Sequence, residues 1–212
     1  MKRYLLQGLF LLIVFLLTSE LTGNNFYPDD DFSPAKQEMP IFYRADTAWV
    51  DSIMNSLNLE EKISQLLMVA AYSNRGKEHK QEISEMIENY NVGGLIFFQG
   101  GPLRQVQLIN HYQSIAKTPL LIAMDAENGA GMRLDSCISY PKQMMLGSIR
   151  DESLLYQMGY DIGQQLRMLG VHVNFAPVVD INNNPANPVI NNRSFGEDRM
   201  NVARKSFMYS QG

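Results

Sequence analysis

The stretch LLIAMD, residues 120–125, decides the fold class of this chain, because five apolar residues run directly into a carboxylate. A short, uninterrupted apolar run of this kind is typical of a strand buried on both faces of a parallel sheet. Similar runs occur at MVAAY, residues 68–72, and at GLIFF, residues 94–98, and a further strand is expected at residues 171–179. The sequence therefore predicts four strands, of which the last ends at Asp180.

Two helices are predicted before the first of these strands. Asp46 is a suitable N-cap for a helix whose apolar residues recur at helical spacing. The apolar face of this helix consists of Trp49, Val50, Ile53, Met54 and Leu57. Asn58, with Glu61 three residues later, has the pattern of a capping box and predicts the start of a second helix. The apolar residues that this second helix carries are Ile63, Leu66 and Leu67.

Helices are also predicted between and after the strands, from apolar residues that fall on one side of a helix. The segment before the second strand has Ile83, Met86, Ile87 and Tyr90. The segment before the third strand has Leu108, Tyr112 and Ile115. A long helix that stops at Gly170 has Leu154, Leu155, Met158, Ile162 and Leu166. A last helix is expected to start near Met200.

Alternating helices and strands predict an α/β fold with a parallel sheet, which leaves a doubly wound sheet and a barrel to choose between. The loop after the first strand, SNRG at residues 73–76, lacks the glycine pattern of a dinucleotide-binding turn. Polar residues instead collect after the third and fourth strands, where a barrel places its active site. We predict the N-terminal half of a TIM-type (β/α)8 barrel with four βα units, since a whole barrel usually needs about 250 residues.

The composition excludes several classes of protein. Hydrophobic residues make up 45% of the 212 residues, which is too many for a disordered or collagen-like chain. The 18 basic and 22 acidic residues give a net charge of −4, and no stripe of basic residues indicates a nucleic-acid surface. The single cysteine, Cys137, and three widely separated histidines do not have the spacing of metal ligands. We therefore expect no cofactor, no metal and no nucleic-acid partner.

The N-terminal residues are predicted to direct export. Lys2 and Arg3 precede an apolar run from Tyr4 to Leu17, which is too short for a membrane-spanning helix and fits the core of a signal peptide. We assign residues 1–23 to a signal peptide, or alternatively to an uncleaved anchor that is the chain's only expected contact with a membrane. Residues 24–45 are polar and interrupted by prolines, as in a linker, and residues 46–212 form the globular part. The expected location is periplasmic or secreted.

Two polar loops follow the third and fourth strands. In the first polar loop, residues 124–133, Asp125 supplies hydroxyl acceptors and Arg133 a cationic donor, the groups with which proteins recognise sugars. An equally simple interpretation is that Asp125 caps the next turn and Arg133 is a solvated surface charge. In the second polar loop, residues 180–198, Asp180 and the asparagines that precede Arg193 are turn-forming residues, so their roles can be structural.

Four motifs occur in an order that resembles glycoside hydrolase family 3, over residues 46–212. The motifs are LEEKISQL at 59–66, DAENG at 125–129, NFAPVVD at 174–180 and RSFGED at 193–198. The last motif is more similar to the β-N-acetylhexosaminidase branch than to the β-glucosidase branch. By this resemblance Asp125 binds the hydroxyls of the non-reducing sugar, Arg193 contacts the same sugar, and Arg133 is a further substrate-binding arginine.

The resemblance also bears on which carboxylates are catalytic. Asp125 and Glu127 could be the two carboxylates of a retaining glycosidase, which lie ~5–5.5 Å apart, but residues separated by one position rarely flank one bond. In the family the nucleophile and the acid/base pair come later in the sequence. We therefore expect no catalytic residue within this chain, and place those residues beyond Gly212.

The resemblance implies an exported, retaining glycosidase that releases terminal β-linked N-acetylhexosamine residues and is represented here by an inactive N-terminal fragment. Its expected partner is a glycan that contains N-acetylglucosamine. Two alternatives remain open, a β-glucosidase of the same family and a non-catalytic carbohydrate-binding barrel fragment.

Overall fold

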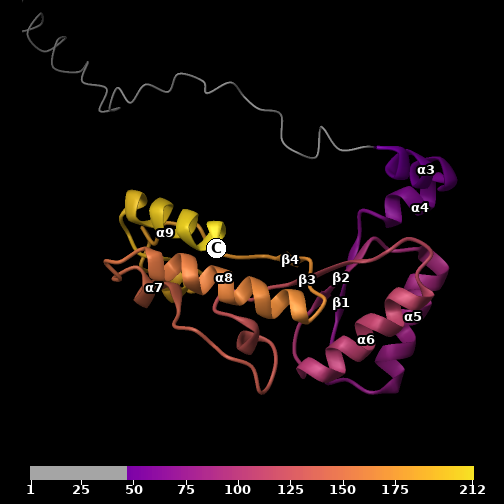
Figure 1. Ribbon diagram of the computed structural model, residues 1–212, viewed down its shortest axis with the longest axis horizontal. Coiled ribbons are helices and arrows are strands. Elements are labelled where there is room, and N and C mark those ends of the chain that lie inside the picture. Colours follow the sequence, from indigo (N-terminus) through magenta and orange to yellow (C-terminus); the bar gives the residue numbers. More distant parts are fainter. Residues whose placement is uncertain (1–46) are drawn as a thin grey trace, which may run out of the picture. The chain divides into compact units, whose positions relative to one another are not determined.

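The computed structural model of the protein describes residues 47–212, of which residues 48–212 form one compact unit (Figure 1). The predicted signal peptide, the linker and the Asp46 cap lie outside the described residues. In this part of the chain no helix is long and apolar enough to cross a membrane.

Helices and strands alternate along the described chain, as the sequence predicts. The strands are β1 (Met68–Ala71), β2 (Gly94–Phe97), β3 (Leu121–Met124) and β4 (Val173–Asn174). The α-helices are α3 (Ala48–Ser56), α4 (Leu59–Ser64), α5 (Lys77–Tyr90), α6 (Pro102–Ile115), α7 (Gln143–Leu146), α8 (Ser153–Met168) and α9 (Arg199–Gln211). Two short 3-10 helices, η1 (Ala130–Met132) and η2 (Asn191–Arg193), lie in the polar loops.

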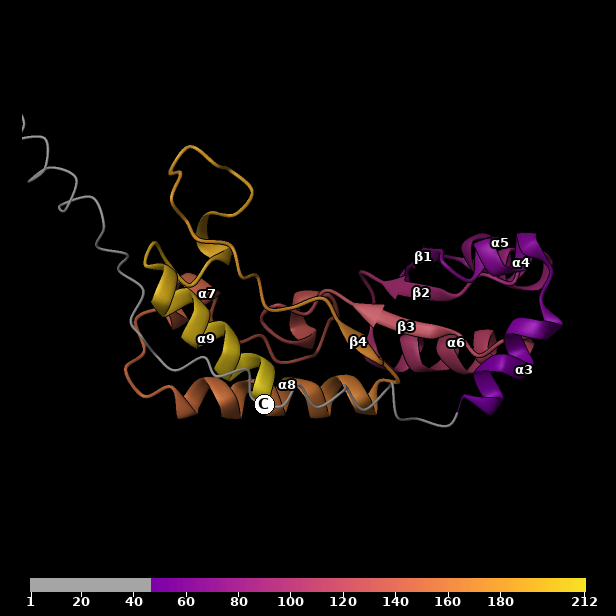
Figure 2. The same cartoon turned by 90° about the horizontal axis from the view of Figure 1, so that it is seen from above.

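The four strands form one parallel sheet in the order β1-β2-β3-β4 (Figure 2). A doubly wound sheet reverses its strand order at a switch point, whereas a barrel adds each new strand on the same side of the last. Because parallel crossovers are right-handed, an unreversed order also places the crossover helices on one face of the sheet. The structure thus confirms the predicted α/β class and its four barrel-type βα units.

The core lies on the helix-covered face of the sheet. Leu95, Phe97, Ile122 and Met124 are fully buried and occupy alternate positions of β2 and β3, as the period of two in a strand requires. Leu121 belongs to the opposite face and is 47% exposed. The helix-covered face of the sheet therefore supplies most of the apolar burial. The polar groups lie at the carboxyl ends of the strands.

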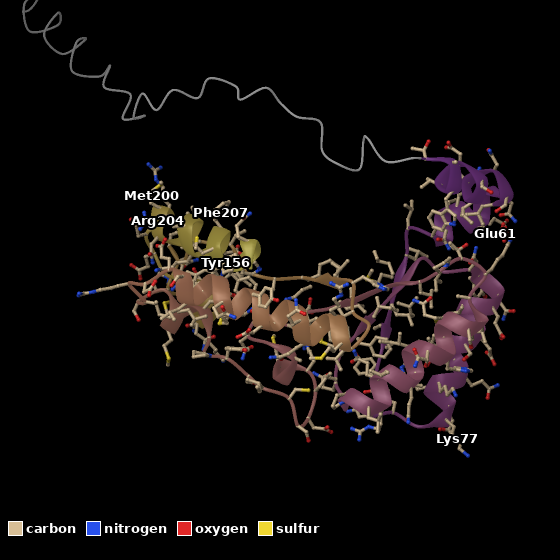
Figure 3. All side chains as sticks on the ribbon, in the orientation of Figure 1. Glu61, Lys77, Tyr156, Met200, Arg204 and Phe207 are labelled. Carbon is tan, nitrogen blue, oxygen red and sulfur yellow. The ribbon has the colours of Figure 1, made fainter. Side chains whose placement is uncertain are left out.

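The predicted capping box at the start of α4 is confirmed. The Asn58 side chain accepts from the Glu61 N–H at 2.9 Å, and a Glu61 carboxylate oxygen accepts from the Asn58 N–H at the same distance. Glu61, labelled in Figure 3, also pairs with Lys117 at 2.5 Å. The hydrogen bonds from Lys117 and Asn58 lower the pKa of Glu61.

The predicted apolar faces of the first two helices are wrong in part. No side chain of α3 is buried within the described residues, although Leu57 just after it is. Helix α4 ends at Ser64, so Leu66 and Leu67 lie in the turn before β1, and Leu66 is 85% exposed. Apolar spacing indicates which side of a helix can be buried, but burial itself requires an element that packs against that side.

Two further predictions need correction. The fourth strand is two residues long instead of nine, because its pairing with β3 stops where β3 ends, at the bond from the Phe175 N–H to the Met124 carbonyl. The extended residues that follow are held by a side chain instead, since the Gln143 amide exchanges two hydrogen bonds with the Val178 backbone. Leu154 of α8 is exposed, because it is rotated by one position, about 100°, from the buried face. The buried residues of that face are Leu155, Met158, Ile162 and Leu166.

Candidate sugar-binding site

The candidate site lies at the carboxyl edge of the sheet, where the two polar loops leave β3 and β4. Asp125 is the first residue after β3, and Glu127 follows two positions later. Arg193 lies at the end of η2 in the second polar loop, whose outer part extends away from the sheet in Figure 2. The parallel arrangement of β3 and β4 brings both loops to the same edge.

Asp125 and Arg133 form an ion pair within the first polar loop. The Arg133 Nη2 donates to Asp125 Oδ2 at 2.9 Å, and its Nε donates to the Asp125 main-chain carbonyl at 2.9 Å. The side chain of Arg133 is only 16% exposed, so it is not the solvated surface charge of the simpler interpretation. Within residues 47–212 the second carboxylate oxygen, Oδ1, has no hydrogen-bond partner, and 28% of the Asp125 side chain is exposed.

Glu127 and Arg193 form a second ion pair, which joins the two polar loops. The Arg193 Nη2 donates to Glu127 Oε1 at 2.6 Å, and Nε lies 3.1 Å from both carboxylate oxygens. The hydrogen bonds that Arg193 donates to Glu127 raise the pKa of Arg193 above its usual value, against an opposing effect of burial. The negative charges of Glu127, Asp125 and Asp180 raise the pKa of Arg193 in the same direction.

The backbone of residues 125–127 is fixed from two sides. The Asn174 side chain accepts from the Ala126 N–H at 2.9 Å, which gives the first residue of the NFAPVVD motif a structural role. The Tyr209 hydroxyl of α9 lies 3.3 Å from the Ala126 carbonyl and 3.2 Å from the Glu127 carbonyl. Burial raises the pKa of Tyr209 to about 12.

A glycine allows Tyr209 to reach this position. A Cβ atom on Gly159 of α8 would lie 2.2 Å from the Tyr209 carbonyl oxygen, a distance that no side chain tolerates. Helices α8 and α9 therefore cross closely at Gly159, and they lie against each other in Figure 1. The closeness of the two helices brings the Tyr209 hydroxyl to the loop that carries Glu127.

The second polar loop has its own anchors. The Ser194 hydroxyl donates to the Asp180 carbonyl at 2.6 Å and closes the base of the loop. The Arg193 Nη1 donates to the Val189 carbonyl at 3.3 Å. A guanidinium has five N–H donors, so the bonds to Glu127 and Val189 leave one N–H on each terminal nitrogen for a ligand. The ordering of Arg193 thus precedes any binding event.

A cavity of about 330 Å³ opens beside the Glu127–Arg193 pair. Its lining residues are Glu127, Asn128, Met132, Lys142, Gln143, Asn192 and Arg193. The volume is at the lower end of the range of small-molecule sites, which is roughly 300–1,000 Å³. Of the three residues predicted to bind substrate, Arg193 lines the cavity, whereas Asp125 and Arg133 are not among its lining residues and pair with each other.

Sequence reasoning missed most of this lining. The motifs indicate Glu127 only as a possible catalytic carboxylate. In the structure Glu127 forms an ion pair with Arg193 instead. Lys142 and Gln143 belong to no motif, and only the folded chain brings them to Arg193. Both oxygens of Glu127 accept from Arg193, so neither is free to attack an anomeric carbon or to protonate a leaving group. The geometry therefore does not favour catalysis by Glu127.

No cluster of His, Cys, Asp and Glu that could hold a metal ion occurs among residues 47–212. The one cysteine, Cys137, is half-buried, and burial raises the pKa of its thiol, followed by the charge of Asp135.

A four-stranded parallel sheet in unreversed order, with a cavity at its carboxyl edge, is the architecture of an α/β barrel domain. Residues 58–212 match the model of the glycosyl hydrolase family 3 N terminal domain, and the chain belongs to that family. The first of its curated relatives, beta-hexosaminidase A of Pseudoalteromonas piscicida, is 37% identical over 130 residues, a match that covers 55% of this chain and 22% of that enzyme. A beta-N-acetylglucosaminidase/beta-glucosidase of Cellulomonas fimi is 28% identical over 162 residues, which cover 76% of this chain and 28% of that enzyme.

A solved structure supports the same family and fold. The glycoside hydrolase family 3 beta-N-acetylglucosaminidase of a Paenibacillus species is 36% identical, with a TM-score of 0.63 over 72% of this chain and 30% of that chain. The chain thus spans less than a third of the length of each of these three relatives.

Proposed function

We propose that this chain is the sugar-binding part of an exported glycosidase that releases terminal β-linked N-acetylhexosamine residues with retention of configuration. The observation that carries the proposal is the cavity lined by the Glu127–Arg193 ion pair, together with the Asp125–Arg133 ion pair at the same carboxyl edge of the sheet. Asp125 Oδ1 and two N–H groups of Arg193 are available for the hydroxyls of one sugar ring. Arg133 orients the Asp125 carboxylate and acts on the ligand indirectly, by holding that carboxylate in place.

The names of the relatives support an N-acetylhexosamine as the sugar. A hexosaminidase and an N-acetylglucosaminidase are among them, which favours a substrate with an N-acetyl group. The nucleophile and the acid/base, by this proposal, come from sequence that these 212 residues do not include. Export is supported by the basic residues at the start of the chain and by the apolar run at Tyr4–Leu17. N-terminal sequencing of the exported protein tests whether this segment is cleaved. A sequence that still begins at Met1 contradicts a cleaved signal peptide.

Binding to the 212-residue chain tests the sugar-recognition step. Saturation-transfer NMR with N-acetylglucosamine is expected to show transfer from the protein, which falls in an Arg193→Ala variant and is unchanged in Arg204→Ala, an exposed arginine of α9. The absence of transfer in the wild-type chain contradicts the proposal.

Hydrolysis tests where catalysis resides. The 212-residue chain is expected to leave p-nitrophenyl N-acetyl-β-D-glucosaminide intact, while an enzyme that contains the chain hydrolyses it and first releases the β-anomer. Turnover by the 212 residues alone that is lost on Glu127→Gln contradicts the assignment of catalysis to other sequence.

A β-glucosidase is the second candidate, because the Cellulomonas fimi relative carries both activities in its name. The same NMR experiment with glucose in place of N-acetylglucosamine separates the two. We expect the N-acetylated sugar to compete with glucose for the site and to displace it at equal concentration. Displacement in the opposite direction favours the glucosidase.

A further inference from the structure

A row of aromatic and guanidinium groups lies at the carboxyl edge of the sheet and ends at Arg133. Tyr72 and Phe98 are the first residues after β1 and β2, just as Asp125 is the first residue after β3. Because the last residues of these strands are paired in register, the residues that follow them lie side by side at the carboxyl edge. The row therefore follows directly from the parallel sheet.

Each neighbouring pair in this row is in contact. The Tyr72 and Phe98 rings are stacked, with centroids 5.6 Å apart and planes inclined by 23°. The Arg133 guanidinium carbon lies 5.0 Å from the Phe98 centroid, and the Arg75 guanidinium carbon lies 3.7 Å from the Tyr72 centroid. Both distances are within the range of cation–π attraction, about 6 Å. Two rings thus separate two guanidinium groups.

The row matters because of what Arg133 does at its far end. Arg133 gives Asp125 one hydrogen bond at the main-chain carbonyl and one at Oδ2, which requires its planar guanidinium to hold one orientation. Those two bonds alone leave the guanidinium free to tilt and to reach Oδ1 as well. Contact with the face of Phe98 restricts that tilt.

We propose that Phe98, supported by Tyr72, is a positioning residue for Arg133. Its ring holds the guanidinium in the orientation that binds only one oxygen of Asp125 and leaves Oδ1 free for a sugar hydroxyl. The consequence for sugar binding rests on the proposed function, whereas the orientation of Arg133 does not.

Chemical modification of arginine measures that orientation without any activity. The 212-residue chain is treated with phenylglyoxal, and the rate at Arg133 is compared with that at Arg204 by mass spectrometry of peptides. In a Phe98→Leu variant the rate at Arg133 is expected to rise between about 2-fold and 30-fold, the range that corresponds to one cation–π contact, with no change at Arg204. Phe98→Tyr, which keeps the ring, is expected to restore the slow rate.

Phe97→Leu is the matched control, because Phe97 is fully buried in the core and the ring that the Arg133 guanidinium contacts is that of Phe98. An unchanged Arg133 rate in Phe98→Leu overturns the proposal. An equal rise in Phe97→Leu, or an equal rise at Arg204, shows general loosening of the fold and also overturns it. Saturation transfer to N-acetylglucosamine is then measured on Phe98→Leu and is expected to fall. If the wild-type chain binds no sugar, the proposed function fails while the modification rates still decide the role of Phe98.

Discussion

Glu127 and Arg193, which are 66 residues apart in the sequence, form an ion pair that fixes the second polar loop against the first. The Arg193 side chain is 39% exposed and Glu127 only 8%, so the pair presents its cation to solvent and buries its anion. A buried carboxylate with both oxygens satisfied is a structural group, and the exposed guanidinium is the group that can meet a ligand. The different exposure of the two side chains thus assigns the structural role to Glu127 and the ligand-facing role to Arg193.

Replacement of Arg193 by lysine is expected to weaken N-acetylglucosamine binding at least about tenfold, because charge-assisted hydrogen bonds contribute about 1.5–3 kcal/mol and one ammonium cannot replace a planar fork. Titration calorimetry on the 212-residue chain measures the change. Arg204→Lys is the control, since Arg204 lies on α9 and pairs with Glu152 at 3.4 Å. Equal affinities for the Arg193→Lys chain and the wild type remove Arg193 from the site.

Two substitutions at Asp125 are expected to separate binding from stability. Asp125→Asn keeps an acceptor oxygen for Arg133 and should preserve most of the stability, but it loses the negative charge that strengthens a bond from a sugar hydroxyl. Asp125→Ala also leaves the Arg133 guanidinium without its side-chain partner, which costs a further 1–3 kcal/mol, roughly the penalty of an unsatisfied buried group. Urea denaturation and calorimetry of both variants measure the two effects. Equal losses of stability in the two variants contradict the role of the ion pair.

Tyr209→Phe is expected to lower stability at neutral pH by about 0.5–1.5 kcal/mol, because it removes the hydroxyl that donates to the backbone of residues 126 and 127. The pH dependence carries a second signature. Burial raises the folded-state pKa of Tyr209 to about 12, above the usual 10.0, so its unfolded form ionises first. Stability from this group is therefore complete below pH 10 and is lost as the pH rises towards 12.

The Tyr209→Phe chain should show a shallower fall of stability over that interval, in denaturation curves measured at several pH values. Part of the fall remains, because burial also raises the pKa of Tyr112 to about 12. Tyr90→Phe, at an exposed position on α5, is the control and should match the wild type. A Tyr209→Phe chain with the wild-type pH profile argues against a buried, protonated Tyr209.

Asn58→Ala is expected to destabilise the chain by about 0.5–2 kcal/mol, the usual cost of a lost N-cap. The measurement is the urea midpoint, with Asn55→Ala in the exposed part of α3 as the control. A midpoint as high as that of the control means that α4 does not depend on its capping box.

The parts of the fold that could be predicted are those that local patterns determine. The apolar runs at 68–72, 94–98 and 120–124 form strands, because a short apolar run that alternates with helices is typical of a strand buried in a parallel sheet. The segment 171–179 contains His172, Asn174 and Pro177 among its apolar residues, and only Val173 and Asn174 pair, because β3 offers no partner beyond Met124. The length of a strand depends on the neighbouring strand, so it cannot be predicted from the pattern of the strand's own residues.

The same limit explains the site. Asp125, Arg133 and Arg193 could be selected from motifs, and the structure brings all three to one edge of the sheet. Which carboxylate each arginine pairs with could not be predicted, because Asp125 and Glu127 are two positions apart in one loop and the sequence does not give the direction of either side chain. The Arg193–Glu127 pair could not be predicted either, because the two residues are 66 positions apart in the sequence. Nothing near Lys142 in the sequence indicates that this residue lines the cavity.

The most direct test of the central claim is a crystal structure of the chain with N-acetylglucosamine bound. We predict one sugar ring in the cavity next to Glu127, with hydroxyl oxygens about 2.7–3.2 Å from Asp125 Oδ1 and from a terminal nitrogen of Arg193. We also expect the Glu127–Arg193 and Asp125–Arg133 pairs to persist in the complex. A sugar that binds elsewhere, or that binds in the cavity without contact to Asp125 and Arg193, contradicts the claim.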